Sequence, residues 1–194
     1  MSRGKSIDTL LQPLAEKPIQ AYFGEGRHTL GLLQWILKQT GKSTVFVSSY
    51  STSEPFLNGF YLLRQKDKVE KALLLLDQRA ARKTLQLEHL MTGSFDHVFL
   101  GQNHSKVLLI HNRNWQVSVV TSQNQTYGNR AESTIITTDK EVYEQLMKQM
   151  EDTIVHGAAE IDIAHGTGII AGSREASLSA ADSPSDWQPF GVEW

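Results

Sequence analysis

The sequence predicts an α/β protein in which a mixed β-sheet is flanked by helices on both faces. Two observations lead to this prediction. Through the first hundred residues, short apolar stretches rich in β-branched residues alternate with stretches of helical spacing. After that, strand-like stretches follow one another before one last long helix. Alternation of strands and helices is typical of parallel sheets, whereas consecutive strands pair antiparallel, so a mixed sheet accommodates both patterns.

The elements of the alternating part follow from periodicity and composition. Leu30, Leu33 and Leu37 recur at helical spacing, whereas Val45, Phe46 and Val47 form a buried-strand pattern. The predicted strands are Ile19–Phe23, Ser43–Ser48, Val69–Leu76 and Asp96–Leu100, and the predicted helices are His28–Lys38, Thr52–Arg64 and Arg79–Met91. Ser53 is a candidate N-cap of the second helix, with Pro55 in its first turn.

The second part of the chain is predicted to contain three strands and a helix. The strands are His104–Ile110, Val117–Val120 and Glu132–Thr138, with His111–Gln116 as a hairpin loop between the first two. Asp139 is predicted to cap a helix that runs to about His156. That helix places these apolar residues on one face: Tyr143, Leu146, Met147, Met150 and Ile154.

Composition divides the chain into a predicted domain, residues 1–157, and an acidic extension rich in Gly, Ala and Ser, residues 158–194. Residues 1–138 hold 16 Lys and Arg against 10 Asp and Glu, whereas residues 139–194 hold 3 against 11. This asymmetry could pair a basic working surface with an acidic element, although a solvated helix and tail is the favoured interpretation of the acidic part. Within the extension, Ile161–Ile170 could add a strand, and the residues beyond Ser173 are expected to be flexible. Its three large aromatics, Trp187, Phe190 and Trp194, either dock on the body or a partner chain or have no such role.

The same totals weigh against several classes of protein. The longest aliphatic run is Leu73–Leu76, far short of the roughly 20 apolar residues of a membrane helix, so no stable membrane insertion is expected. The first 18 residues lack the apolar core of a signal peptide, and cysteine is absent. These features favour a cytoplasmic protein that has no disulfide and no thiolate chemistry.

The candidate chemistry centres on His104 and Lys106. On a strand the two side chains share one face, and an imidazole beside an ammonium suits an anionic substrate. A neutral histidine can attack phosphorus while a lysine stabilises the negative oxygens. His-x-Lys alone is a weak signal, because chance produces such pairs among 7 histidines and 19 basic residues.

Polar residues after the next strand strengthen this interpretation. Ser122 and Asn124 share a face if extended, and both offer hydrogen-bond donors for phosphate oxygens. Glu132, at the start of the following strand, is a carboxylate that could hold the ring of His104. Each residue also has an ordinary interpretation, as part of a polar turn or as a surface glutamate.

Taken together, His104-x-Lys106, Ser122-x-Asn124 and Glu132 resemble the motif of the phospholipase D superfamily, and in particular its small single-motif nucleases. The resemblance covers residues 104–138, and the alternation before it agrees with the sandwich fold of that family. It implies that His104 is the nucleophile that forms a phosphohistidine, that Lys106, Ser122 and Asn124 bind the phosphoryl group, and that Glu132 orients His104. It also implies that no metal or cofactor is needed.

The resemblance is incomplete in two respects. The family has an Asp five residues after the Lys and a Gly before the Ser, whereas this sequence has His111 and Thr121. The family also uses two facing motifs, whereas this sequence has one. A homodimer with one composite active site would supply the second histidine. The alternative use of His97, His104 and His111 as a metal site lacks the convergent geometry that zinc needs.

The predicted reaction is hydrolysis of a phosphodiester, and nucleic acid, DNA or RNA, is the favoured substrate. The following basic residues could form a patch for phosphate backbones or merely solvated helix ends: Arg64, Lys66, Lys68, Arg79, Arg82 and Lys83. Two alternatives remain open. One is hydrolysis of a lipid or small-molecule phosphodiester, and the other is a nucleic-acid-binding module that has lost catalysis through the change to His111.

Overall fold

A computed structural model of the chain describes residues 7–25, 28–80, 86–125 and 130–161. The strands are β1 (Ile19–Gly24), β2 (Ser43–Ser49), β3 (Val69–Asp77), β4 (His97–Gly101), β5 (Val107–His111), β6 (Gln116–Thr121), β7 (Glu132–Thr137) and β8 (Ala158–Glu160). The helices are α1 (Thr29–Thr40), α2 (Glu54–Gln65), α4 (Glu88–Thr92) and α5 (Lys140–Gly157), with 3₁₀ turns at Ile7–Thr9 and Gln78–Ala80.

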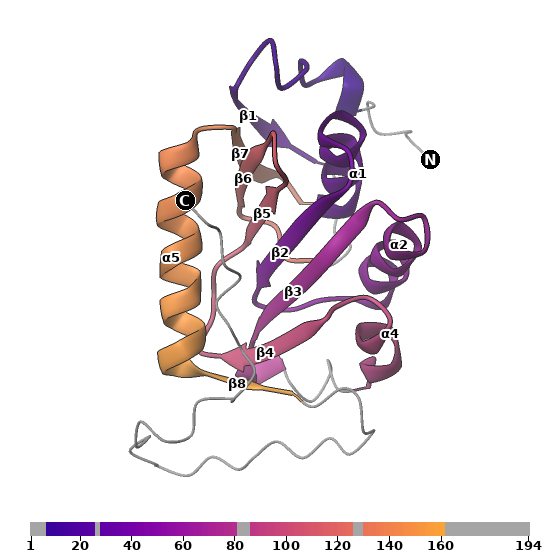
Figure 1. Cartoon of the computed structure of the whole chain (residues 1–194), viewed down its shortest axis with the longest axis vertical. Helices are drawn as coiled ribbons and strands as arrows, with labels where there is room; N and C mark the ends of the chain where they lie inside the picture. Colours follow the sequence, from indigo (N-terminus) through magenta and orange to yellow (C-terminus); the bar gives the residue numbers. More distant parts are fainter. Residues whose placement is uncertain (1–6, 26–27, 81–85, 126–129, 162–194) are drawn as a thin grey trace.

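These strands form one mixed sheet in the order β1-β7-β6-β5-β2-β3-β4-β8. Strands β2, β3 and β4 run parallel, and all the other neighbours in the order pair antiparallel. Figure 1 shows α5 along one face of this sheet and α1, α2 and α4 along the other. The predicted α/β architecture, a mixed sheet with helices on both faces, is therefore confirmed.

Two apolar cores hold the helices to the sheet. Beneath α1, α2 and α4, the larger core includes the strand residues Val45, Val47 and Leu74. Beneath α5, the smaller core joins Phe46 and Leu73 to the helix residues. Since both faces of β2 and β3 are covered, their sequences are nearly continuous apolar runs, as central strands of such sheets usually are.

The strand directions bring several chain segments to one edge of the sheet. The carboxyl ends of β2, β3 and β4 lie there, because Ser49 pairs with Leu76 and Asp77 with Gly101. The amino end of β5 lies there too, because Val107 pairs with Ser48. The end of β6 and the start of β7 follow in the antiparallel register. We call this the catalytic edge, because the candidate residues lie along it.

Among the residues that the structure describes, no helix covers part of the sheet on the α5 side. Val107 packs against the core beneath α5, and its register partners Val120 and Ile135 carry the same face of the sheet towards β1. This stretch leaves four apolar side chains exposed: Val120 43%, Ile135 53%, Ile19 61% and Phe23 77%. We call these four residues the open apolar face.

Several predicted boundaries are wrong. The helix expected at Arg79–Met91 is replaced, in its described parts, by the 3₁₀ turn Gln78–Ala80 and the five-residue α4. The strand expected from His104 begins only at Val107, and His111 ends that strand instead of opening the hairpin loop. For the strand, apolar periodicity identified the segment but not its limits, because the ladder partners that set these limits lie far away in sequence.

The two predicted helix caps differ in outcome. Asp139 caps α5 as expected, because its Oδ1 accepts from the backbone N–H of Val142 at 3.0 Å. Ser53 occupies the N-cap position of α2 but makes no capping bond, since its Oγ donates to the carbonyl of Gln125 at 3.0 Å. This hydroxyl therefore ties α2 to the loop after β6, which is part of the catalytic edge.

At the carboxyl end of the described chain, β8 pairs with β4. Residues 158–160, the first of the predicted acidic extension, are thus the outermost strand of the sheet. The predicted strand Ile161–Ile170 lies outside the described residues except for Ile161, which is buried in the larger core. The predicted flexible tail and its aromatics Trp187, Phe190 and Trp194 also lie outside them, and the domain boundary at 157 stays a prediction.

Candidate active site

His104 lies in the loop between β4 and β5, at the catalytic edge, and its side chain is exposed. The residues on either side are held in place. Asn103 is buried and bonds to the ends of β2 and β3, and the carbonyl of Lys106 accepts from the N–H of Thr121 at 3.0 Å. An exposed imidazole thus projects from a loop whose two ends are fixed to the sheet.

Lys106 adjoins His104 although neither residue is on a strand. Its Nζ lies 3.1 Å from His104 Nδ1 and donates to the His104 carbonyl at 2.6 Å. Partial burial lowers the pKa of Lys106, and the charge of Glu132 opposes this effect. The predicted proximity of the imidazole and the ammonium is therefore present, but a folded-back lysine produces it rather than strand alternation.

Glu132 and Ser122 form a second pair at this edge. Ser122 Oγ donates a short hydrogen bond to Glu132 Oε2 and accepts from the backbone N–H of Ser133 at 3.0 Å. The predicted hydrogen bond between Glu132 and His104 is not present between these two described side chains. The carboxylate acts instead on Ser122 directly and on Lys106 through its charge.

Asn124 completes the set of predicted phosphate-binding residues. Burial alternates along this loop, so Gln123 and Gln125 are buried while Ser122 and Asn124 are more exposed. The two predicted residues thus share a side, as expected for an extended segment. Asn124 Oδ1 is buried and has no hydrogen-bond partner within the described ranges.

Sequence reasoning missed several residues around His104. The ring of Tyr50, which follows β2, lies with its centroid 5.2 Å from that of His104. Asp77, which ends β3, accepts from the N–H of Asn103 at 2.9 Å. A polar residue directly after a buried strand was the available signal for both, because ligands of open α/β sheets bind at such strand ends.

His111 lies at the other end of β5 from His104. Its Nδ1 is 2.6 Å from the hydroxyl of Tyr143 on α5, and its ring stacks on Phe46 at a centroid distance of 5.8 Å. Burial lowers the pKa of His111 and raises that of Tyr143. The imidazole and the phenol thus share a hydrogen bond, so His111 attaches α5 to the sheet at the end of β5 opposite to the catalytic edge.

The contact between His111 and Tyr143 predicts a loss of stability in mild acid. With the pKa of His111 below its unfolded value of 6.5, the unfolded chain binds more protons between these two values. The contribution of neutral His111 to the free energy of unfolding is complete above pH 6.5 and is lost as the pH falls through the pKa of His111 in the folded protein. In urea titrations between pH 7 and pH 5, the free energy of unfolding should fall more steeply for the wild type than for His111→Gln. Parallel profiles would contradict this role.

The described members of the predicted basic patch do not form one surface. Arg64, Lys66 and Lys68 lie near the amino end of β3, whereas Arg79 follows its carboxyl end. A nine-residue strand separates the two groups by roughly 30 Å at about 3.3 Å per residue. Arg82 and Lys83 lie outside the described residues. Of the described members, only Arg79 lies near the catalytic edge.

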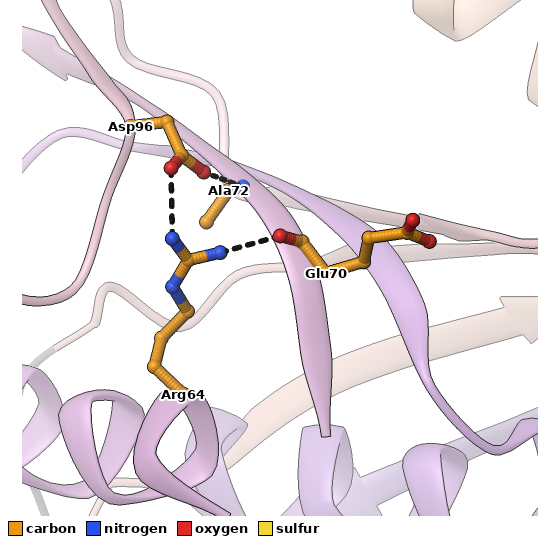
Figure 2. Close-up of polar contacts among 4 residues, drawn as sticks. All are labelled: Arg64, Glu70, Ala72 and Asp96. Carbon is orange, nitrogen blue, oxygen red and sulfur yellow. Dashed lines mark hydrogen bonds and ion pairs between the residues drawn. The ribbon is translucent and has the colours of Figure 1, made fainter. Parts of the chain in front are cut away.

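Figure 2 shows the polar contacts that join Arg64, Glu70, Ala72 and Asp96. The Arg64 guanidinium donates to the carbonyl of Glu70 and to Asp96 Oδ1, both at 2.7 Å. Asp96 Oδ2 accepts in turn from the N–H of Ala72, also at 2.7 Å. Arg64 therefore connects α2 to the start of β3 and to the segment before β4, and these two hydrogen bonds hold its guanidinium in place.

Arg64→Ala should consequently lower stability rather than nucleic-acid affinity. Loss of hydrogen bonds that involve charged groups costs about 1.5–3 kcal/mol, measured as the free energy of unfolding in urea. Lys66→Ala is the matched control, because this neighbouring lysine is exposed and makes no side-chain hydrogen bond within the described chain. If Arg64→Ala had normal stability but bound DNA more weakly, Arg64 would be a DNA-binding residue and not a structural one.

The structure also bears on a metal site and on a membrane-spanning helix. In the described ranges, no group of three or more acidic or histidine side chains could bind a metal ion. His97 and His111 lie at the opposite end of the sheet from His104, and His97 pairs with Glu160 at 2.7 Å. None of the helices in the described part of the chain combines the length and apolarity needed to cross a membrane.

Comparison with known proteins relates the fold to solved structures. No family model and no curated protein matches the sequence. The polyphosphate kinase of Porphyromonas gingivalis is similar over 74% of this chain and 24% of its own, with a TM-score of 0.50 and 13% identity. The phosphatidylserine synthase of Haemophilus influenzae Rd KW20 is similar over 74% and 40%, with a TM-score of 0.55 and 10% identity.

A third similar structure is TrmBL2, an archaeal chromatin protein described as having a novel mode of DNA binding. The likeness covers 73% of this chain and 53% of that one, with a TM-score of 0.50 and 10% identity. This chain therefore spans between about a quarter and about half of the three structures. The kinase and the synthase have phospholipase D-like folds, which confirms the fold predicted from the sequence.

Proposed function

We propose that this protein is a phospholipase D-like phosphodiesterase that acts through a phosphohistidine at His104. The observation that carries the proposal is the contact between His104 and Lys106, at 3.1 Å, beside the Ser122 and Glu132 pair. An exposed nucleophile, a cation and neutral hydrogen-bond donors around one point are what transfer of a phosphoryl group requires. The fold likeness to two enzymes with phospholipase D-like folds supports the proposal.

The first step forms a bond between a ring nitrogen of His104 and phosphorus, while the bond from phosphorus to the leaving oxygen breaks. A second histidine donates a proton to that oxygen as general acid. Lys106 moves from the His104 ring to the phosphoryl oxygens, where it neutralises charge, and this movement frees Nδ1. In the second step, water attacks the phosphohistidine, the second histidine accepts its proton, and His104 leaves.

The second histidine is the partner subunit's His104 in a homodimer with one composite active site. The open apolar face supports a homodimer, because Val120, Ile135, Ile19 and Phe23 expose apolar surface that a second copy would bury. This face adjoins the candidate residues, since Phe23 precedes Gly24, the register partner of Glu132. Pairing through this face would bring the two catalytic edges close to each other.

Nucleic acid is the proposed substrate, and the reaction is proposed to be endonucleolytic. TrmBL2, which shares the fold, is a DNA-binding protein, and Arg79 supplies one exposed cation near the catalytic edge. A lipid or small-molecule phosphodiester is the second candidate, favoured by the fold likeness to phosphatidylserine synthase. Binding of DNA without turnover would instead indicate a module that has lost catalysis.

The test is hydrolysis of bis(p-nitrophenyl) phosphate and of plasmid DNA in excess EDTA. Because Lys106 and the histidines stabilise the developing charge in this proposal, turnover should continue in EDTA. Phosphatidylcholine vesicles provide the lipid arm, with choline release as the readout. Activity that disappears in EDTA and returns with a divalent ion would overturn the metal-independent mechanism.

A further inference from the structure

The loop that carries His104 is fixed by the buried residue just before it. Asn103 is 6% exposed, and its Nδ2 donates to Ser48 Oγ at 2.9 Å and to the carbonyls of Ser49 and Leu75 at 3.2 Å. These acceptors belong to β2 and β3, which are neighbouring parallel strands. One side chain thus joins the catalytic loop to two central strands.

The other end of the same amide holds the residue just after His104. Asn103 Oδ1 accepts from the N–H of Ser105 at 3.0 Å and from its Oγ at 2.7 Å. Ser105 Oγ also lies 2.5 Å from Ser48 Oγ. The backbone is therefore bound on both sides of His104, and the imidazole between them is the only one of the three side chains that projects without an anchor to the sheet.

Asp77 fixes Asn103 itself. This carboxylate is 6% exposed, and its Oδ2 accepts from the N–H of Asn103 at 2.9 Å while its Oδ1 accepts from the N–H of Arg79 at 2.8 Å. A carboxylate is seldom buried unless hydrogen bonds compensate for its desolvation. Its place at the end of β3 gives the loop a third fixed point, independent of the Asn103 side chain.

We propose that Asn103, supported by Asp77 and Ser105, is the positioning residue of His104. Nucleophilic attack on phosphorus requires the imidazole nitrogen, phosphorus and leaving oxygen to be in line. A loop without regular secondary structure would otherwise sample many ring positions, and the Asn103 amide restricts this sampling before substrate binds. The inference rests on the proposed function of His104 and extends it to a residue that does not touch substrate.

The chain contains a matched control for this proposal. Asn112 also makes five side-chain hydrogen bonds, donating from Nδ2 to Thr40, Lys42 and Ser43 and accepting at Oδ1 from the N–H groups of Asn114 and Trp115. It follows β5, at the end of the sheet opposite to His104. Asn112→Ala therefore removes a comparable network without disturbing the catalytic loop.

The experiment measures kcat and KM for bis(p-nitrophenyl) phosphate with folded Asn103→Ala, Ser105→Ala and Asn112→Ala. For Asn103→Ala we expect kcat to fall about 100-fold with KM changed less than about threefold, because an error of about 1 Å in position has effects of this size. Ser105→Ala, which loses only hydroxyl bonds, should lie between this variant and wild type. Asn112→Ala should retain kcat within about twofold even where its stability falls.

Amide hydrogen exchange provides a readout that does not need activity. Exchange of the Ser105 amide should accelerate in Asn103→Ala and stay unchanged in Asn112→Ala, because only the first variant removes its acceptor. Unchanged exchange in Asn103→Ala, or an equal loss of kcat in both Asn variants, would overturn the positioning role. A wild type without turnover but with the predicted exchange difference would refute the proposed function and leave the loop anchor standing.

Discussion

Replacement of His104 by Ala is expected to reduce kcat for bis(p-nitrophenyl) phosphate by about 10⁴- to 10⁶-fold. The imidazole supplies the attacking nitrogen in this account, and Ala offers nothing in its place. Within a dimer the same substitution also removes the general acid, because both roles belong to the same residue in two subunits. Few single substitutions in this chain should have a larger effect on activity.

Stability should change little in this variant, because His104 is exposed and its ring interacts with Lys106 and Tyr50 at the surface. His156→Ala is the matched control, since His156 is an exposed histidine in the last turn of α5. Activity should be measured beside a urea titration for each variant. Equal turnover by wild type and His104→Ala would remove His104 from the mechanism.

Phe23→Asp is expected to separate the subunits and to abolish most of the activity. Phe23 is 77% exposed on the open apolar face, so a charge at this position would be buried without a partner in the dimer but solvated in a monomer. Loss of the second histidine removes general acid catalysis, which is worth about 10²–10⁴-fold. Light scattering should give the mass of one chain for this variant and of two for the wild type.

Leu62→Asp provides the control, because Leu62 is 54% exposed on α2, on the other side of the sheet. This variant should keep both the mass of a dimer and the activity of the wild type. A wild type that is a strict monomer at the assay concentration, or a dimeric Phe23→Asp, would show that the open apolar face is not the subunit interface.

The position of His111 in the structure changes the interpretation of this residue, which stands where the resembled motif has Asp. From the sequence, this difference raises the possibility of lost catalysis. The structure places its ring against Phe46 and Tyr143, in contact with α5. A change at this position is therefore expected to alter docking of the helix and acid stability, with the catalytic edge left intact.

The sequence predicted the composition of the site better than its local structure. His104, Lys106, Ser122 and Glu132 lie along one edge as expected, because the order of strands determines which loops meet. The proximity of His104 and Lys106 was expected from strand alternation, yet both residues precede β5. The contact was predicted correctly, but the strand that was expected to produce it is not there. A lysine side chain is long enough to fold back on its own loop, and this accounts for the contact.

The residues that sequence reasoning missed depend on contacts between distant segments. Asn103 bonds to Ser48 and to the carbonyl of Leu75, which are 55 and 28 residues away. Local pattern indicates nothing about such contacts until the strands are paired. The prediction of one basic patch was wrong for its described members, because closeness in sequence does not ensure closeness in space. Lys68 and Arg79 are close in sequence but lie at opposite ends of β3.

In the proposed mechanism His104 becomes covalently bound to phosphorus during turnover, and this intermediate can be trapped. The protein would be quenched at alkaline pH during hydrolysis of bis(p-nitrophenyl) phosphate, digested, and analysed by mass spectrometry. We expect the peptide that contains His104 to carry a p-nitrophenyl phosphoryl group, because the first step expels only one of the two p-nitrophenolates, and we expect no such adduct in His104→Ala. Sustained turnover with an unmodified His104, or with the adduct on another residue, would contradict this mechanism.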